Sequence, residues 1–150
     1  MATFSIYGTS NARLRGARFT KRADGTVLMG ALVQKGTAAG DVKETDASTN
    51  NLYGIAIINE AAASDNNDSD GNAQYQYEDN DPLVVEALVT GQIYNLANSG
   101  TAAIAEGALV EMAADGKVVA GTTDPIGIAI SGISGSSRGD VLFQPFRNDA

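Results

Sequence analysis

GALV at residues 30–33 and YGIAI at residues 53–57 return later in the chain as GALV at residues 107–110 and IGIAI at residues 126–130. Counted from the glycine of one block to the glycine of the next, the spacing is 24 residues in the first copy and 20 in the second. Two identities in the same order, at nearly the same spacing, indicate one β supersecondary unit that is used twice. This duplication is the strongest structural signal in the chain.

Large and small residues alternate within both copies of the second block. In the first copy, Ile55 and Ile57 lie on one face of the expected strand and Gly54 and Ala56 on the other. The large residues would fill the interior of a barrel or sandwich, and the small ones would let another backbone lie close above them. Two similar buried strands without such a neighbour are the alternative interpretation.

Further short strands, separated by turns, are predicted along the rest of the chain. The expected strands are residues 26–34 with a break at Gly30, 41–44 at a sheet edge, 52–59, 83–90, 92–96, 108–112, 117–120, 125–130 and 140–145. Asp115-Gly116 predicts a type I′ hairpin. Residues 101–106 are expected to form a short helical turn, and the acidic stretch 64–81 a long loop or hairpin tip. The predicted fold is therefore all-β, a small β-barrel or sandwich built from two related strand-turn-strand units.

Charge is distributed unevenly along the chain. Residues 1–23 hold five bases and no acid, a charge of +5, whereas residues 24–150 hold 18 acids against five bases, a charge of −13, which together give the net −8. We therefore expect two parts: an extended basic N-terminal arm over residues 1–23 and a single β domain over residues 24–150.

The basic arm is the candidate binding site. Its arginines could bind carboxylates of an acidic protein surface through their planar forks, and Phe4, Ile6 and Tyr7 could pair with a strand edge of that partner. A solvated tail is the simpler interpretation of a polar terminus. Nucleic acid is not an expected partner, because the acidic body would repel it.

Composition excludes several classes of activity. The chain has no cysteine and no histidine, so Ser-His and Cys-His nucleophilic pairs and ordinary zinc sites are ruled out. Catalysis by carboxylates or lysine remains possible but is not favoured, and we predict no catalytic, cofactor-binding or metal-binding residue. No apolar run approaches a membrane span and no signal peptide is indicated, so we expect a soluble protein without a membrane partner.

Two short motifs have simple structural explanations. Residues 66–71, Asn-x-Asp-x-Asp-Gly, resemble the opening of a calcium loop, but the twelfth position is Tyr77 rather than an acid, so a solvated acidic loop is the better interpretation. Arg138-Gly139-Asp140 spells an adhesion tripeptide. It stands where a turn leads into a strand, which accounts for the glycine and the aspartate.

Residues 82–146 resemble the small capsid decoration, or cement, proteins of tailed viruses of the bacteriophage type. The pattern consists of a Gly-x-x-Val strand, an Asp-Gly-Lys-Val hairpin, an Ile-Gly-x-Ala strand and a final apolar strand; here these are residues 106–110, 115–118, 126–129 and 141–143. Residues 24–60 show a weaker form of the same pattern. The matching residues form the fold, so no functional residue of the family is carried over.

The resemblance implies a virion protein with no enzymatic role. Such proteins are made in the host cytoplasm, bind the outer surface of the expanded capsid, often as homotrimers, and bridge subunits of the major capsid (coat) protein. They commonly reach the shell with an N-terminal arm, which suits the basic leader. The predicted capsid-binding residues are those of the arm: Phe4, Ile6, Tyr7, Arg13, Arg15, Arg18, Lys21 and Arg22.

Two rival functions remain open on the sequence. A carbohydrate-binding or fibre-associated β module of a virion would need exposed aromatic rings, which only Tyr75, Tyr77 and Tyr94 could supply. A carboxylate-dependent hydrolase would use acids of the 64–81 stretch, but the sequence nominates no pair.

Overall fold

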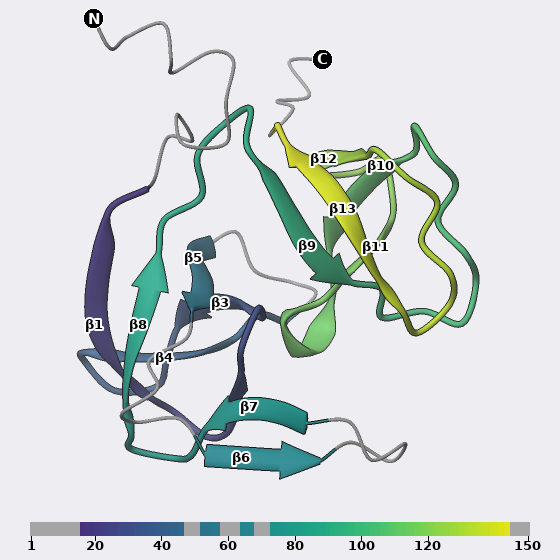
Figure 1. The fold of residues 1–150 in the computed structure, drawn as a ribbon. Helices are drawn as coiled ribbons and strands as arrows, with labels where there is room; N and C mark the ends of the chain where they lie inside the picture. Colours follow the sequence, from purple (N-terminus) through teal and green to yellow (C-terminus); the bar gives the residue numbers. More distant parts are fainter. Residues whose placement is uncertain (1–15, 47–51, 58–63, 68–72, 145–150) are drawn as a thin grey trace, which may run out of the picture.

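The computed structural model describes residues 16–46, 52–57, 64–67 and 73–144, and the side chains of these except in residues 64–67 and 73–75. Within these residues the chain is built from short strands arranged in two halves that lie side by side, with a hairpin below the first half (Figure 1). The all-β prediction is confirmed.

The first half is a closed five-stranded barrel. Its strands follow the order β1 (Arg18–Ala23), β4 (Asp41–Glu44), β3 (Leu32–Lys35), β5 (Leu52–Ile57) and β8 (Pro82–Glu86). β1 and β4 run parallel and every other neighbouring pair is antiparallel. The sequence predicted β4 as an edge strand, but β4 is paired on both sides because the barrel closes between it and β1.

The second half has the same strand order. Its sheet runs β11 (Val118–Ala120), β10 (Leu109–Met112), β12 (Pro125–Ala129), β13 (Arg138–Phe143) and β9 (Ile93–Ala97). The outer strands meet through a parallel bridge between Asn98 and Val118, and the N–H of Ser99 donates to the carbonyl of Val118 at 2.8 Å. This bridge stands where β1 and β4 pair in the first half.

The remaining strands form a small sheet beside the first barrel, in the order β2 (Val27–Leu28), β7 (Ala73–Tyr77) and β6 (Ser64–Asn67). The acidic stretch therefore contains the two paired strands of a hairpin, whereas a long loop or a hairpin tip was predicted for it. In the second half, an isolated bridge between Ile104 and Ile133 occupies the place of the β2–β7 pair.

The two halves are copies of one module, which we name the first repeat (residues 16–87) and the second repeat (residues 91–143). Their central strand pairs share one register and one bulge, which follows the valine in both copies. The shared pairs are a leucine opposite an isoleucine and a valine opposite a glycine: Leu32–Ile55 and Val33–Gly54 in the first repeat, Leu109–Ile128 and Val110–Gly127 in the second. The duplication predicted from GALV and GIAI thus extends to the whole strand order.

A neighbouring backbone explains the small residues of the repeated block. A Cβ atom on Gly54 would lie 2.2 Å from the carbonyl oxygen of Glu86 in β8, and one on Gly127 would lie 2.4 Å from that of Leu142 in β13. Only glycine permits such a close approach between the two strands. The interpretation that small residues make room for another backbone is confirmed at these two glycines, where that backbone is the next strand of the sheet. The expectation that the large residues fill the barrel interior is wrong at Ile55, because the small Ala56 belongs to the cluster of the first barrel and Ile55 to that of the second repeat.

The hairpin at Asp115-Gly116 also forms as predicted. It joins β10 to β11 through a short 3-10 turn, Ala114–Gly116, and both central residues have positive φ, 59° at Asp115 and 68° at Gly116. Positive φ at both positions defines the type I′ turn, whose twist matches that of the flanking strands.

Two further predictions fail. Residues 18–23, assigned to the extended arm, form strand β1, and residues 18–22 pair with β8. The polar residues Arg18, Thr20 and Arg22 face solvent, while Ala23 is buried, so a charged sequence still supplies a barrel strand. Residues 101–106 form no helical turn, because the buried Ile104 is held by two backbone hydrogen bonds to Ile133.

Two hydrophobic clusters hold the fold. One fills the first barrel and consists of Ala23, Val27, Val33, Val42, Ala56, Tyr77, Leu83 and Val85. The other fills the second repeat, with Leu96, Ile104, Val110, Val118, Ile126, Ala129, Ile133 and Val141, and it also takes in Leu32 and Ile55 of the first repeat. The second cluster therefore continues across the boundary between the repeats.

Candidate functional site

The arginines of β1 lie on its exposed outer face. Nε of Arg18 lies 3.0 Å from Oε1 of Glu86, and both Nε and Nη2 of Arg22 lie 2.7 Å from Oδ1 of Asp41. Both arginine side chains remain about half exposed, at 48% and 51%. Exposed pairs of this kind contribute about 0–1 kcal/mol each, so another carboxylate could compete for these guanidinium groups.

Lys21 occupies the other face of β1. Its Nζ lies 6.0 Å from the centre of the Phe19 ring, which in turn meets Tyr53 edge-on with 6.4 Å between ring centres. The ammonium group therefore caps a small aromatic pair at the barrel wall. The remaining predicted capsid-binding residues, Phe4, Ile6, Tyr7, Arg13 and Arg15, lie outside the described residues.

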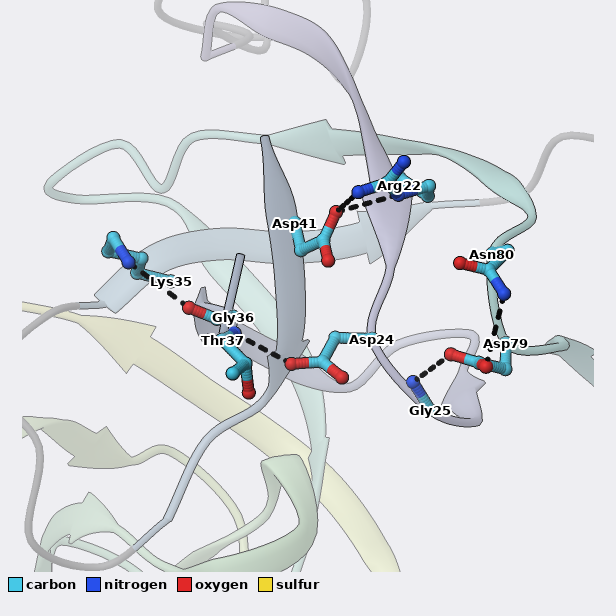
Figure 2. A network of polar contacts seen from close by, with 9 residues as sticks. All are labelled: Arg22, Asp24, Gly25, Lys35, Gly36, Thr37, Asp41, Asp79 and Asn80. Atoms are coloured by element: carbon cyan, nitrogen blue, oxygen red, sulfur yellow. Dashed lines mark hydrogen bonds and ion pairs between the residues drawn. The ribbon is translucent and has the colours of Figure 1, made fainter. Parts of the chain in front are cut away.

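Acidic side chains near the end of β1 serve as acceptors for the backbone. Figure 2 shows Asp24 accepting the N–H of Thr37 at 2.7 Å and Asp79 accepting that of Gly25 at 2.8 Å. The hydrogen bonds from Thr37 hold the pKa of Asp24 below its usual range. These carboxylates tie loops of the first barrel together.

Glu44 on β4 is the acid whose pKa rises. Burial raises the pKa of Glu44, and the negative charge of Asp115 adds to the rise. The N–H of Leu28, which donates to Oε1 of Glu44 at 3.1 Å, partly stabilises the charged form and opposes the rise. Glu44 therefore carries a desolvated charge close to the boundary between the repeats.

The tyrosines proposed for sugar binding are mostly structural. Tyr77 is fully buried and its hydroxyl donates to the carbonyl of Ile57 at 2.7 Å. Tyr94 is half-buried, packs edge-on against Phe143 and accepts the N–H of Val89 at 2.8 Å. The side chain of Tyr75 lies outside the described part.

The adhesion tripeptide belongs to β13. Arg138 donates hydrogen bonds to the side-chain and main-chain oxygens of Asn95, at 2.9 and 2.7 Å. Nδ2 of Asn95 in turn donates to Oδ1 of Asp140 at 3.2 Å. A Cβ on Gly139 would lie 2.5 Å from Cγ1 of Ile133. Contacts between β13 and β9 account for Arg138 and Asp140, and the close approach of Ile133 accounts for Gly139.

Metal and membrane sites can be assessed for the described part alone. Residues 68–72, which complete the calcium-loop opening, lie outside it. Among the residues that the structure describes, no group of three or more acids, histidines or cysteines could hold a metal ion, and no helix is long and apolar enough to cross a membrane.

Comparison with known proteins places the chain in a family. Residues 5–142 match the family described as structural cement protein (E217 gp24/Pam3 gp6), so the chain belongs to the phage structural cement proteins. It is a capsid decoration protein, a structural component of the virion located on the capsid. The family resemblance inferred from the second repeat is therefore confirmed.

A solved structure shares the fold. It is the N base of head fibre gp8.5 of bacteriophage phi29, which aligns with a TM-score of 0.55 and 14% identity over 88% of this chain and 98% of that one. At this identity the likeness concerns the fold alone. No curated protein sequence matches the chain.

Proposed function

We propose that the chain cements the shell through a cationic surface formed by the outer face of β1 and the basic segment before it, which binds acidic groups of the coat protein. Arg18 and Arg22, on the same face of β1 and half exposed, support this proposal most directly. Their present partners, Glu86 and Asp41, compete only weakly with another carboxylate. The role is mechanical and involves no chemical step.

The preceding segment would add both charge and strand pairing. Arg13 and Arg15 bring two more guanidinium groups, and Phe4, Ile6 and Tyr7 could align with a sheet edge of the coat protein. Because residues 18–23 belong to the barrel, the attachable arm is residues 1–15 rather than 1–23. Bridging several coat subunits from one homotrimer would then strengthen attachment, since each bound arm raises the effective concentration of the others.

Co-sedimentation with expanded capsids of its own virus tests the proposal. We expect a chain lacking residues 2–15 to keep its far-ultraviolet circular dichroism and to lose capsid binding. Arg18→Gln with Arg22→Gln should weaken binding and reduce its dependence on salt, because surface charges are screened at high ionic strength. Lys117→Gln, which removes one positive charge from the second repeat, is the control. Full binding by both altered chains would refute a role for this surface.

A further inference from the structure

The second repeat covers the part of the first repeat's outer face that is formed by Leu32 of β3 and Ile55 of β5. Leu32 and Ile55 are 0% and 7% exposed and belong to the hydrophobic cluster of the second repeat. Their chain neighbours Val33 and Ala56 belong to the cluster of the first barrel. Since side chains alternate along a strand, Leu32 and Ile55 point out of their own barrel and into the contact between the repeats.

A hairpin tip of the second repeat completes this contact. The hydroxyl of Thr45 donates to the carbonyl of Ala113 at 3.2 Å, and the N–H of Gly116 donates to the carbonyl of Thr45 at 3.3 Å. A Cβ on Gly116 would lie 2.6 Å from that of Ala31, so the tip lies directly on the start of β3. The contact thus joins an outer face to a hairpin tip of a copy of the same module.

The corresponding outer face of the second repeat has no such cover among the described residues. Leu109 and Ile128, the counterparts of Leu32 and Ile55, are only half-buried, and a Cβ on Gly107 would meet nothing within 4 Å. A Cβ on its counterpart Gly30 would lie 2.6 Å from Nη2 of Arg138. The same surface is therefore closed in one repeat and open in the other.

This open face is also more apolar than its counterpart. Strand pairing sets Leu109, Ile128, Leu142 and Ile93 in one row across β10, β12, β13 and β9. At the positions of Leu142 and Ile93 the first repeat has the ion pair Glu86 and Arg18. Ile93 is 45% exposed, one of the two exposed large hydrophobic side chains of the described part. A row of apolar residues on a solvent-facing sheet marks an interaction surface.

The first repeat carries the matching tip. Residues 37–40 are exposed, and the turn at residues 38–41 corresponds to that at residues 114–117: the N–H of Asp41 donates to the carbonyl of Ala38 at 3.2 Å, as that of Lys117 does to Ala114 at 3.3 Å. The loop of the first repeat is one residue longer, because Gly36 takes the place of Ala113 in the next hydrogen bond. Gly40 has a positive φ of 85°, like Gly116, although Ala39 lacks the positive φ of its counterpart Asp115. Within the described residues, one outer face and one tip are therefore left uncovered.

We propose that chains associate head to tail, with the tip at residues 37–40 of one copy lying on the Leu109–Ile128 face of the next. The occupant is a second copy of this chain because the contact already exists once inside every chain, between the same parts of the same module. Such a contact joins two different surfaces, and it closes into a ring when successive rotations complete a circle. The inference does not rest on the proposed function, since it concerns the protein without capsids.

Light scattering of the purified full chain, coupled to size exclusion, tests the inference. The wild type should have a mass that is a whole multiple, above one, of 15.4 kDa. Ile128→Glu damages the face and Ala38→Glu damages the tip, and each should give monomers with unchanged circular dichroism, because a charge buried without a partner opposes association. An equimolar mixture should give a 1:1 dimer, since it restores one intact face and one intact tip.

Three outcomes would overturn the inference: a monomeric wild type, an Ala38→Glu chain that still assembles, or a mixture that contains only monomers. Assembly lost by Ile128→Glu but kept by Ala38→Glu would show that the face binds itself. Ile93→Glu, at an exposed position, replaces Ile128→Glu if that variant does not fold. Thr20→Glu places the same charge on the first repeat and should leave the mass unchanged.

Discussion

The close approach of strands at the repeated glycines leads to a graded prediction for three alanine substitutions. In Gly127→Ala the new methyl would lie 2.4 Å from the carbonyl oxygen of Leu142, so β12 and β13 must move apart. Overpacking of this kind costs about 1–3 kcal/mol, offset by about 0.4–1 kcal/mol because alanine restricts the unfolded chain. We expect a net loss of about 1–2 kcal/mol.

Gly54→Ala should be worse, because two effects add. The methyl would lie 2.2 Å from the carbonyl oxygen of Glu86, and the residue has a φ of 156°, which side chains rarely adopt. The unfavourable backbone conformation adds about 1–3 kcal/mol, for a total of about 2–5 kcal/mol. Gly132→Ala is the control, since its methyl would lie 3.9 Å from the nearest atom, the carbonyl oxygen of Ile104, and its effect should stay within about 0.5 kcal/mol.

Urea unfolding followed by circular dichroism and tyrosine fluorescence measures these changes, since the chain has five tyrosines and no tryptophan. Two separate transitions would assign each loss to one repeat, and Gly127→Ala should then lower the transition of the second repeat. Equal midpoints for Gly127→Ala and Gly132→Ala would refute the argument from backbone contact.

Three further substitutions test single contacts. Glu44→Gln should be more stable than the wild type at neutral pH. Burial raises the pKa of Glu44 in the folded protein, so the wild type loses stability as pH rises through that pKa, and the difference in stability should vanish in acid, below the ordinary glutamate pKa. A difference in urea midpoint that is the same at all pH values would contradict this. Tyr77→Phe should cost about 1–3 kcal/mol in thermal or urea unfolding, because the buried carbonyl of Ile57 loses its donor, and an unchanged midpoint would show that water replaces the hydroxyl. Asp115→Val should cost about 1–2 kcal/mol while Asp115→Gly should be nearly neutral, since the turn needs a φ of 59° there; equal stability of these two variants would rule out the type I′ requirement.

The repeated blocks and the hairpin were predictable because local sequence determines them. GALV and GIAI mark the two central strands of each repeat, residue size alternates within GIAI, and Asp115-Gly116 supplies the two residues that tolerate positive φ. The full extent of the duplication was less visible, since β1 and β9 share their place in the fold but almost no residue types.

The candidate site was predicted in part. Arg18 and Arg22 were identified as exposed cations, but their strand was not, because alternate charged residues on the outer face of a barrel resemble an unstructured polar segment. The pattern that indicates a strand is the alternation of exposed Arg18, Thr20 and Arg22 with half-buried Phe19 and Lys21, followed by the buried Ala23. The inter-repeat contact could not be predicted, since Leu32 and Leu109 stand in identical GALV blocks and differ only in what covers them.

The two repeats differ most in the connection that follows the repeated block. Twenty positions separate Ile57 from Tyr77, but three separate Ile130 from the corresponding Ile133. The module therefore accepts a long insertion at this point while its strand order stays the same. Foreign peptides grafted at Ser131 and Gly132, both exposed, should accordingly be displayed on the particle without disturbing the scaffold beneath them.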